Sequence, residues 1–259
     1  MLLLLSPAKS LDYESPIPAV PLRRPAFVPE AEALVAALRE RSVPQLQALM
    51  DISPALAELN AARYAAWRPR FTARNSRPAV LAFDGDVYGG LEARSLDADA
   101  LAWADEHLAI LSGLYGLLRP LDALQPYRLE MGVALPNARG PNLYAYWQDT
   151  LARVLNRRVR AQAAPVLVNL ASQEYFKAVP VERLKVPVLQ CVFEDWSGGE
   201  WKVLGLFAKR ARGLMARHVI DHRIDTPQGL EDFDREGYRL DRTASSADRL
   251  VFRRKEKTT

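Results

Sequence analysis

Short, wholly apolar runs alternate along the chain with longer segments in which apolar residues recur every three or four positions. Leu2–Leu5 is the first such run, and residues 165–170 form another that is apolar except for Asn169. Runs this short and this apolar are typical of buried strands. Residues 79–83 are predicted to form a strand by the same reasoning. Residues 186–193 and 201–207 are predicted to pair as a hairpin through Ser197-Gly198-Gly199, and residues 238–240 and 249–253 to form closing strands.

Helical periodicity and capping residues mark several of the segments between these runs. Pro29 precedes a predicted helix over residues 30–41, in which Ala31, Leu34 and Leu38 share one face. Ser53-Pro54 is a cap followed by proline at the first helical position. Further helices are predicted from Pro44, from Pro54 to about Trp67, and at residues 95–111, 142–157 and 208–223.

The interleaving of these elements predicts an α/β fold, with a mixed β-sheet covered by helices. The chain has 259 residues, enough for a sizeable core. It contains no repeat and no stretch typical of a domain linker, so we expect a single domain over residues 1–259.

Composition excludes several classes of protein. Hydrophobic residues make up 49% and charged residues 25%, which excludes a disordered or fibrous chain. Cys191 is the only cysteine, so a disulfide framework is excluded and a reducing compartment is favoured. The apolar start at Leu2–Leu5 is too short for a signal peptide, and no window is long enough for a membrane span. We therefore expect a cytoplasmic protein with no membrane partner.

Positive charge is concentrated late in the chain, although the net charge is only +4. Residues 202–223 carry six cations and one acid, Asp221. Such a local excess predicts a surface that attracts phosphate groups. The cations are Lys202, Lys209, Arg210, Arg212, Arg217 and Arg223.

A glycine-containing turn follows the helix predicted at 95–111. Gly113 and Gly116 flank Leu114-Tyr115, and the chain continues into Arg119-Pro120. This outline suggests a helix-hairpin-helix-like element, whose backbone N–H groups would bind a DNA phosphate. The spacing is wider than in a tight glycine turn, and many helices simply end in glycine.

Other cations stand beside turns and apolar strands. Arg119, Arg128 and Lys177 occupy such positions, and fixing a cation in a turn is costly unless it binds something. Cations from separate turns could line one positively charged cleft. The alternative is a set of structural pairs, such as Arg128 with Glu130 or Asp122.

Two further motifs match known catalytic or metal-binding patterns only in part. Ser6 and Lys9 have the Ser-x-x-Lys spacing of some acyl enzymes, but no Lys-Thr-Gly partner motif is present. His218 and His222 are one helical turn apart, yet Val219 stands where zinc proteases have glutamate. No P-loop or dinucleotide-binding motif is present either. We therefore expect no metal and no cofactor.

The chain closely resembles the YaaA family of bacterial peroxide-stress-resistance proteins. The matching motifs are SPAKSLD (6–12), NAAR (60–63), FDGDVY (83–88), LSGLYG (111–116), LRPLD (118–122), QPYRLEMG (125–132), NLAS (169–172), EYFK (174–177) and KRARGLM (209–215). They cover nearly the whole chain in order. The resemblance implies a cytoplasmic protein that limits iron-driven oxidative damage. It also implies one α/β domain with a positively charged cleft, a helix-hairpin-helix element and binding to duplex or branched DNA. By the match around Gly113, that element would lie at about residues 101–125.

The hypothesis is therefore a DNA-binding peroxide-stress protein that contacts phosphates with little regard to sequence. The candidate DNA-binding residues are Lys9, Gly113, Tyr115, Gly116, Arg119, Arg128, Lys177, Lys209, Arg210 and Arg212. The alternative is an enzyme acting on a nucleotide or another phosphorylated small molecule in the same cleft. It would use Lys9, Arg119, Asp122, Arg128, Glu130, Ser172, Lys177 and Arg212.

Overall fold

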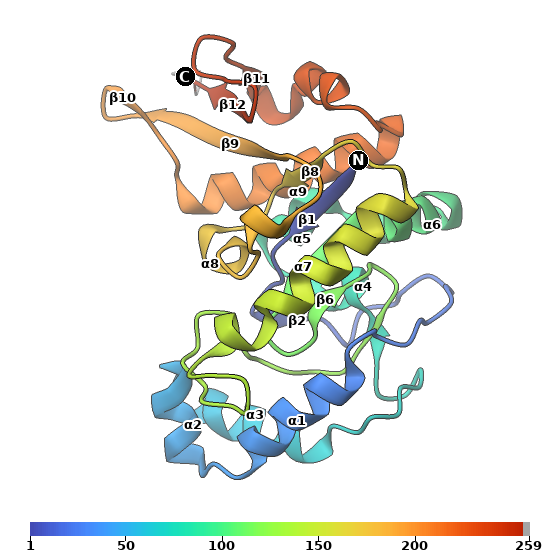
Figure 1. The fold of residues 1–259 in the computed structure, drawn as a ribbon, viewed down its shortest axis with the longest axis vertical. Coiled ribbons are helices and arrows are strands. Elements are labelled where there is room, and N and C mark those ends of the chain that lie inside the picture. The colour runs from blue at the N-terminus through green and yellow to red at the C-terminus, as the bar shows by residue number, and fades with distance from the viewer. Residues whose placement is uncertain (256–259) are drawn as a thin grey trace.

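A mixed eight-stranded sheet forms the centre of the protein, in a computed structural model that describes residues 1–255 (Figure 1). The strand order is β11-β12-β9-β8-β1-β5-β6, with β10 paired to β9. Helices lie on both faces, so the predicted α/β class is confirmed.

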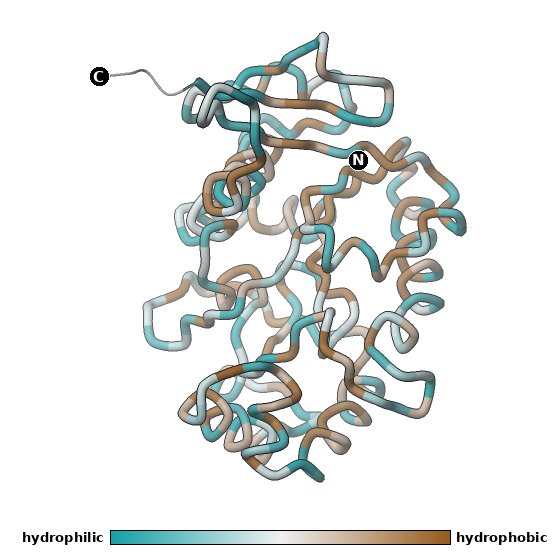
Figure 2. Tube along the Cα trace, turned by 90° about the vertical axis from the view of Figure 1, so that its left-hand side faces the viewer, coloured by the Kyte–Doolittle hydropathy of each residue, from teal (hydrophilic) through white to brown (hydrophobic). Residues whose placement is uncertain are grey.

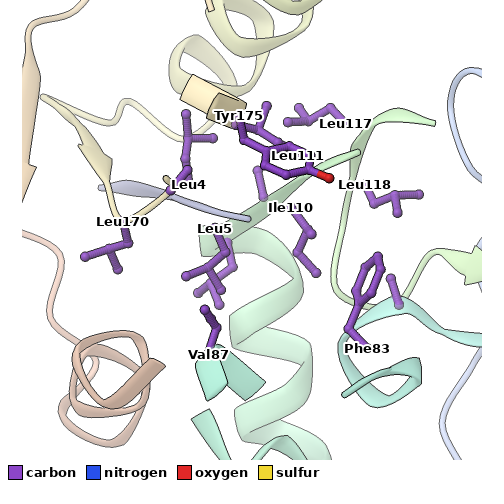
Figure 3. Close-up of a cluster of buried hydrophobic side chains, with 14 of the residues drawn as sticks. Leu4, Leu5, Phe83, Val87, Ile110, Leu111, Leu117, Leu118, Leu170 and Tyr175 are labelled. Atoms are coloured by element: carbon purple, nitrogen blue, oxygen red, sulfur yellow. The ribbon is translucent and has the colours of Figure 1, made fainter. Parts of the chain in front are cut away.

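Strand β1 (Leu2–Leu5) lies in the middle of this sheet. It pairs in parallel with β5 (Leu108–Ser112) on one side and with β8 (Leu167–Asn169) on the other. All four leucines are fully buried, as a strand covered on both faces requires. Figure 3 shows the alternation: Leu4 points to the side of Tyr175, and Leu5 points to the side of Val87.

The remaining strands extend the sheet in both directions. β9 (Val188–Ser197) is parallel to β8, and β12 (Arg249–Arg254) is parallel to β9. Three antiparallel pairings add β6 (Gly116–Leu118), β10 (Glu200–Lys202) and β11 (Arg239–Leu240). Two-residue strands form separate pairs: β2 (Ser10–Leu11) with β4 (Phe83–Asp84), and β3 (Arg77–Pro78) with β7 (Ala123–Leu124).

The long helices begin close to the predicted positions. They are α1 (Val28–Arg39), α2 (Val43–Met50), α3 (Pro54–Ala66), α6 (Ala98–His107), α7 (Leu143–Ala161) and α9 (Gly205–His222). Short helices are α4 (Ala79–Ala82), α5 (Asp86–Leu91) and α8 (Gln173–Phe176). Ser42 and Ser53 cap α2 and α3, each with a proline in the first helical turn.

Helices α1, α2 and α3 lie together at the end of the molecule that is remote from β9–β12 (Figure 1). β1 runs from the N-terminus toward this end, and its apolar stretch is visible as a brown segment in Figure 2. The carboxyl ends of the parallel strands therefore face α1–α3. Among residues 1–255, no helix combines the length and apolar character that crossing a bilayer requires.

Three predicted elements are wrong in type or extent. Residues 79–82 form a helical turn rather than a strand, in which Ala79 and Val80 donate backbone hydrogen bonds to Asp122 and Pro120. The helix predicted to reach residue 111 ends at His107, and the strand predicted at 201–207 ends at Lys202. A short, fully buried apolar run does not distinguish a strand from a helix by its pattern alone.

Candidate functional site

The connections of β1 and β8 define a crevice at the edge of the sheet. The chain leaves β1 toward β5 on one side and leaves β8 toward β9 on the other. In α/β sheets, ligands bind at the carboxyl ends of such adjacent, diverging strands. We call the loops that follow β1 and β8, residues 6–9 and 170–177, the carboxyl edge.

Two serines join these loops directly. The backbone N–H of Ser172 donates to Ser6 Oγ at 2.8 Å, and Ser6 Oγ lies 3.2 Å from Ser172 Oγ. The Tyr175 N–H donates to Ser172 Oγ at 3.5 Å, and the Tyr88 hydroxyl donates to the Ser6 carbonyl at 3.0 Å. The Ser172 hydroxyl thus accepts two bonds and donates none among the described residues, which leaves its hydrogen available to a ligand.

An ionic cluster stands beside this pair. The Lys9 ammonium lies 3.4 Å from Glu130 Oε1, and the Arg128 guanidinium lies 2.9 Å from the same oxygen. Lys9 is two-thirds exposed, whereas the side chains of Arg128 and Glu130 are mostly buried. Glu130 Oε2 is buried and accepts no hydrogen bond within residues 1–255. One carboxylate therefore faces two cations here.

Arg63 of α3 adds a third cation to this cluster. Its Nη1 donates to Asn60 Oδ1 at 3.3 Å, and the next residue, Tyr64, donates its hydroxyl hydrogen to the Arg128 carbonyl oxygen. Burial lowers the pKa of the Arg63 guanidinium, and the nearby charge of Arg128 lowers that pKa further. No carboxylate of the described residues lies within ion-pair distance of Arg63. An anionic ligand would relieve this unfavourable environment.

Lys177 lies on another flank of the carboxyl edge. Its ammonium is 5.1 Å from the ring centroid of Tyr144, whose hydroxyl donates to the Glu174 carbonyl at 3.1 Å. Glu174 Oε1 in turn accepts the Gly132 N–H at 3.0 Å. This chain of contacts connects Lys177 to the loop that holds Arg128 and Glu130.

The comparisons with known proteins agree with the motifs that form this site. Residues 1–244 match the sequence profile of the family described as peroxide stress protein YaaA. The chain belongs to the YaaA family. It is 60% identical to a UPF0246 protein of Paracidovorax citrulli over 257 residues, 99% of each chain. It is also 58% identical to a UPF0246 protein of Bordetella avium over 255 residues, covering 98% of this chain and 99% of that one.

The YaaA-family chain does not bring all the predicted site residues together. Lys9 and Arg128 both contact Glu130. Arg128 was predicted either to line the cleft or to form a structural pair with Glu130, and in the structure it forms that pair, with Lys9 beside it. Arg119 lies at the amino ends of the parallel strands, away from the carboxyl edge. It follows β6, which runs antiparallel to β5 and pairs Leu118 with Ile110, so the chain at Arg119 has returned toward the start of β5. There it is 2.8 Å from Asp105 Oδ2 and also pairs with Glu106.

The helix-hairpin-helix prediction for residues 101–125 is wrong. Helix α6 is followed by the strands β5 and β6, and the turn between them is buried. The Tyr115 N–H donates to Ser112 Oγ at 3.0 Å, and a Cβ on Gly113 would lie 2.1 Å from the Leu129 carbonyl oxygen. Gly116 has φ +67° and packs against the Trp147 ring. Backbone N–H groups in this turn are thus unavailable to a phosphate.

A helical hairpin does exist elsewhere in this YaaA-family chain. α2 and α3 pack against each other and are joined by residues 51–53, with Asp51 in the left-handed conformation at φ 49°. α3 supplies Asn60, Arg63 and Tyr64 to the ionic cluster. Ser53 was predicted as a cap, but the left-handed residue between the helices is an aspartate, so no glycine in the sequence indicated this hairpin.

The predicted cations of α9 differ in their surroundings. Arg210 lies 2.6 Å from Glu236 Oε1, which makes it a surface ion pair. Lys209 is exposed. Arg212 is half-buried, and within residues 1–255 it forms no ion pair and no hydrogen bond; burial alone lowers its pKa.

Two hollows lie away from the carboxyl edge. One of about 390 Å³ is lined by His218, His222, Asp232 and Asp234 with neighbouring residues, and another of about 330 Å³ by Arg23, Arg24 and Phe71 with neighbouring residues. His218 and His222 have ring centroids 4.4 Å apart. In the described part of the chain, no three His, Cys, Asp or Glu side chains converge to hold a metal ion.

Proposed function

We propose that this YaaA-family protein binds DNA at the carboxyl edge, through phosphate contacts made by Arg63, Lys9 and Lys177. The observation that carries the proposal is the half-buried Arg63, which has a cation beside it and no carboxylate partner among the described residues. No negatively charged protein group of the described residues balances the charge of this guanidinium. Phosphate oxygens match a guanidinium in both charge and hydrogen-bond geometry.

Charge at the ionic cluster supports a polyanion. Lys9, Arg63 and Arg128 contribute three positive charges, and Glu130 contributes one negative charge. This excess attracts phosphates before contact and lowers the dissociation rate after it. Contacts of this kind position a backbone and carry no base information, so binding is expected to be largely independent of sequence.

The α2–α3 hairpin supports duplex binding as well. It faces the carboxyl ends of β1 and β8 and contributes Arg63 from its second helix. A backbone that crosses this hairpin can reach Lys9 at the end of β1. In the cell, DNA covered in this way is shielded from iron-driven oxidation, which would link the binding to the family's role in peroxide stress.

The test is a gel-shift titration of a fixed-length duplex and of a four-way junction with Arg63→Gln. We expect binding to weaken by about 10- to 150-fold, because one charge-assisted contact is worth roughly 1.5–3 kcal/mol. Arg157→Gln is the matched control, since this exposed arginine of α7 lies toward the opposite ends of the strands. Equal loss in both variants, or no loss in Arg63→Gln, contradicts the proposal.

A further inference from the structure

Arg212 is a half-buried charge that has no ion-pair partner among the described protein groups. Neighbouring arginines of α9 are paired: Arg210 with Glu236 and Arg217 with Asp221. Arg212 has no such partner within residues 1–255, although it is half-buried. Burial of an unpaired charge is costly, so a residue in this state is expected to serve a ligand.

The helical phase of Arg212 directs it toward the sheet. Ala208, Met215 and Val219 are buried residues of α9 at spacings of four, three and seven from Arg212, so they share its side of the helix. Arg210 and Gly213 lie on another side, where α9 packs against α5. Arg212 therefore lies on the side of α9 that carries these buried residues.

Along the direction of the strands, Arg212 lies at about the same level as the carboxyl edge. The far end of α9 lies at the amino end of β1, because the Met1 amino group donates to the Asp225 carbonyl. The ten residues from Arg212 to His222 span roughly 15 Å of helix. The strand from Met1 to Ser6 spans roughly 16 Å. Arg212 thus stands level with the Ser6–Ser172 pair.

Helix α5 connects the two positions through short contacts. A Cβ on Gly213 would lie 1.8 Å from the Val87 carbonyl oxygen, so the two helices touch at their backbones. The next residue, Tyr88, donates to the Ser6 carbonyl at 3.0 Å. One helical segment therefore separates the residue beside Arg212 from the crevice between β1 and β8.

The ligand chemistry follows from the donors on offer. A guanidinium presents paired N–H groups that fit a phosphate, and the Ser172 hydroxyl hydrogen is unused among the described residues. Access is restricted, because Arg212 lies on the sheet side of α9. The expected ligand is therefore the end of a strand or a small molecule rather than the side of a duplex.

We propose that Arg212 and Ser172 form a subsite for a phosphate monoester at the carboxyl edge, distinct from the backbone contacts of Arg63. The proposal rests on the proposed DNA binding and adds its substrate class: a terminal phosphate. The same chemistry is found in a free nucleoside monophosphate and in a 5′-phosphorylated strand end.

The experiment compares the purified full-length wild-type chain with Arg212→Met and with the matched control Arg210→Met. The first readout is the melting temperature without ligand and with millimolar inorganic phosphate or a nucleoside monophosphate. We expect Arg212→Met to melt no lower than the wild type, because it removes an unpaired buried charge, and to lose the stabilisation by phosphate. Arg210→Met should keep that stabilisation.

The second readout is the affinity for single-stranded oligonucleotides that carry either a 5′-phosphate or a 5′-hydroxyl. The wild type should prefer the phosphorylated end by about tenfold, and Arg212→Met should show no preference. Preference for the phosphorylated strand without stabilisation by free nucleotide would assign the site to DNA ends, and the reverse would assign it to a nucleotide; either outcome supports the subsite.

A wild type that ignores both forms of phosphate overturns the subsite, as does an Arg212→Met variant that behaves like the wild type. Arg212→Lys keeps the charge and loses the paired donors, so it remains informative if Arg212→Met does not fold; unchanged phosphate binding by Arg212→Lys also overturns the proposal. Failure of the proposed DNA binding is recognised separately, because the wild type would then not bind a duplex that lacks terminal phosphates.

Discussion

The backbone N–H of Ser172 donates to Ser6 Oγ at 2.8 Å, although 166 positions separate the two residues in the chain. The bond fastens the loop that follows β1 to the loop that follows β8, at the point where the connections of these strands diverge. Lys9, Ser172 and Lys177 all stand on these loops. The relative positions of the candidate ligand-binding groups therefore depend on this contact.

Ser6→Ala should destabilise the protein by about 1–2 kcal/mol, since it leaves the partly buried Ser172 N–H without its acceptor. Denaturant unfolding measures this loss. Ser10→Ala, at an exposed position of β2, serves as the control and should change stability little. Equal stability of Ser6→Ala and wild type would show that the contact does not fasten the two loops.

Arg119→Met should lower stability without weakening DNA binding. Arg119 lies at the amino ends of the strands and compensates the buried carboxylate of Asp105. Without Arg119, the one ion-pair partner of Asp105 among residues 1–255 is Arg23. We expect a cost of roughly 2 kcal/mol, below the range for a fully buried pair that loses one partner. Unfolding and gel-shift titrations on the same sample separate the effects. Weaker DNA binding by a folded variant would place Arg119 in the interface after all.

Stability should fall as pH rises from about 4 to about 8 because of Asp122. Burial raises the pKa of this carboxyl from 3.8 to about 7, and the nearby Asp105 carboxylate adds to the effect. The folded state therefore holds a proton that the unfolded chain releases between these values. The associated stability is complete below pH 3.8 and is lost as pH rises through about 7.

Asp122→Asn tests this prediction, because the amide stays neutral at every pH and can still accept the Arg119 N–H. The free energy of unfolding of the wild type should drop by roughly 2–4 kcal/mol more than that of the variant between pH 4 and 8. Asp99→Asn, at an exposed position, should follow the wild type. Parallel pH profiles for Asp122→Asn and wild type would contradict the assignment.

Gly113→Ala should destabilise the whole protein and should not act on DNA binding alone. The added Cβ would lie 2.1 Å from the Leu129 carbonyl oxygen, so the hairpin of β5 and β6 must shift. Overpacking of this kind costs about 1–3 kcal/mol. Gly199→Ala is a contrasting control: it meets no atom within 4 Å, although its positive φ of 86° carries a smaller strain. A folded Gly113→Ala variant of normal stability that has lost DNA binding would restore the turn as a docking element.

The sequence pattern predicted most of the fold because burial and capping are local signals. Leu2–Leu5 is apolar at every position, and Ser53 stands directly before Pro54, in the first turn of α3. The failures occurred where apolar residues continue without a change of period. Leu108 follows Asp105, Glu106 and His107 directly, with no glycine or proline between them, so nothing in the pattern marked the point where α6 ends and β5 begins.

The candidate site was predicted less completely because charge compensation is not local. Asp105 stands 14 positions before Arg119, and nothing in the sequence indicates their contact. Arg63 was visible only as part of a family motif, since its importance comes from the absence of a partner in the described fold. The Arg128–Glu130 pair was foreseen because the two residues lie close together in the chain.

The most direct test of the proposed function is the salt dependence of DNA affinity for wild type and Arg63→Gln. The logarithm of the binding constant should fall linearly with the logarithm of salt concentration, and the variant should lose about 0.9 from the slope. Arg157→Gln should keep the slope of the wild type. A wild-type affinity that does not depend on salt, or identical slopes for Arg63→Gln and wild type, would contradict phosphate binding at the carboxyl edge.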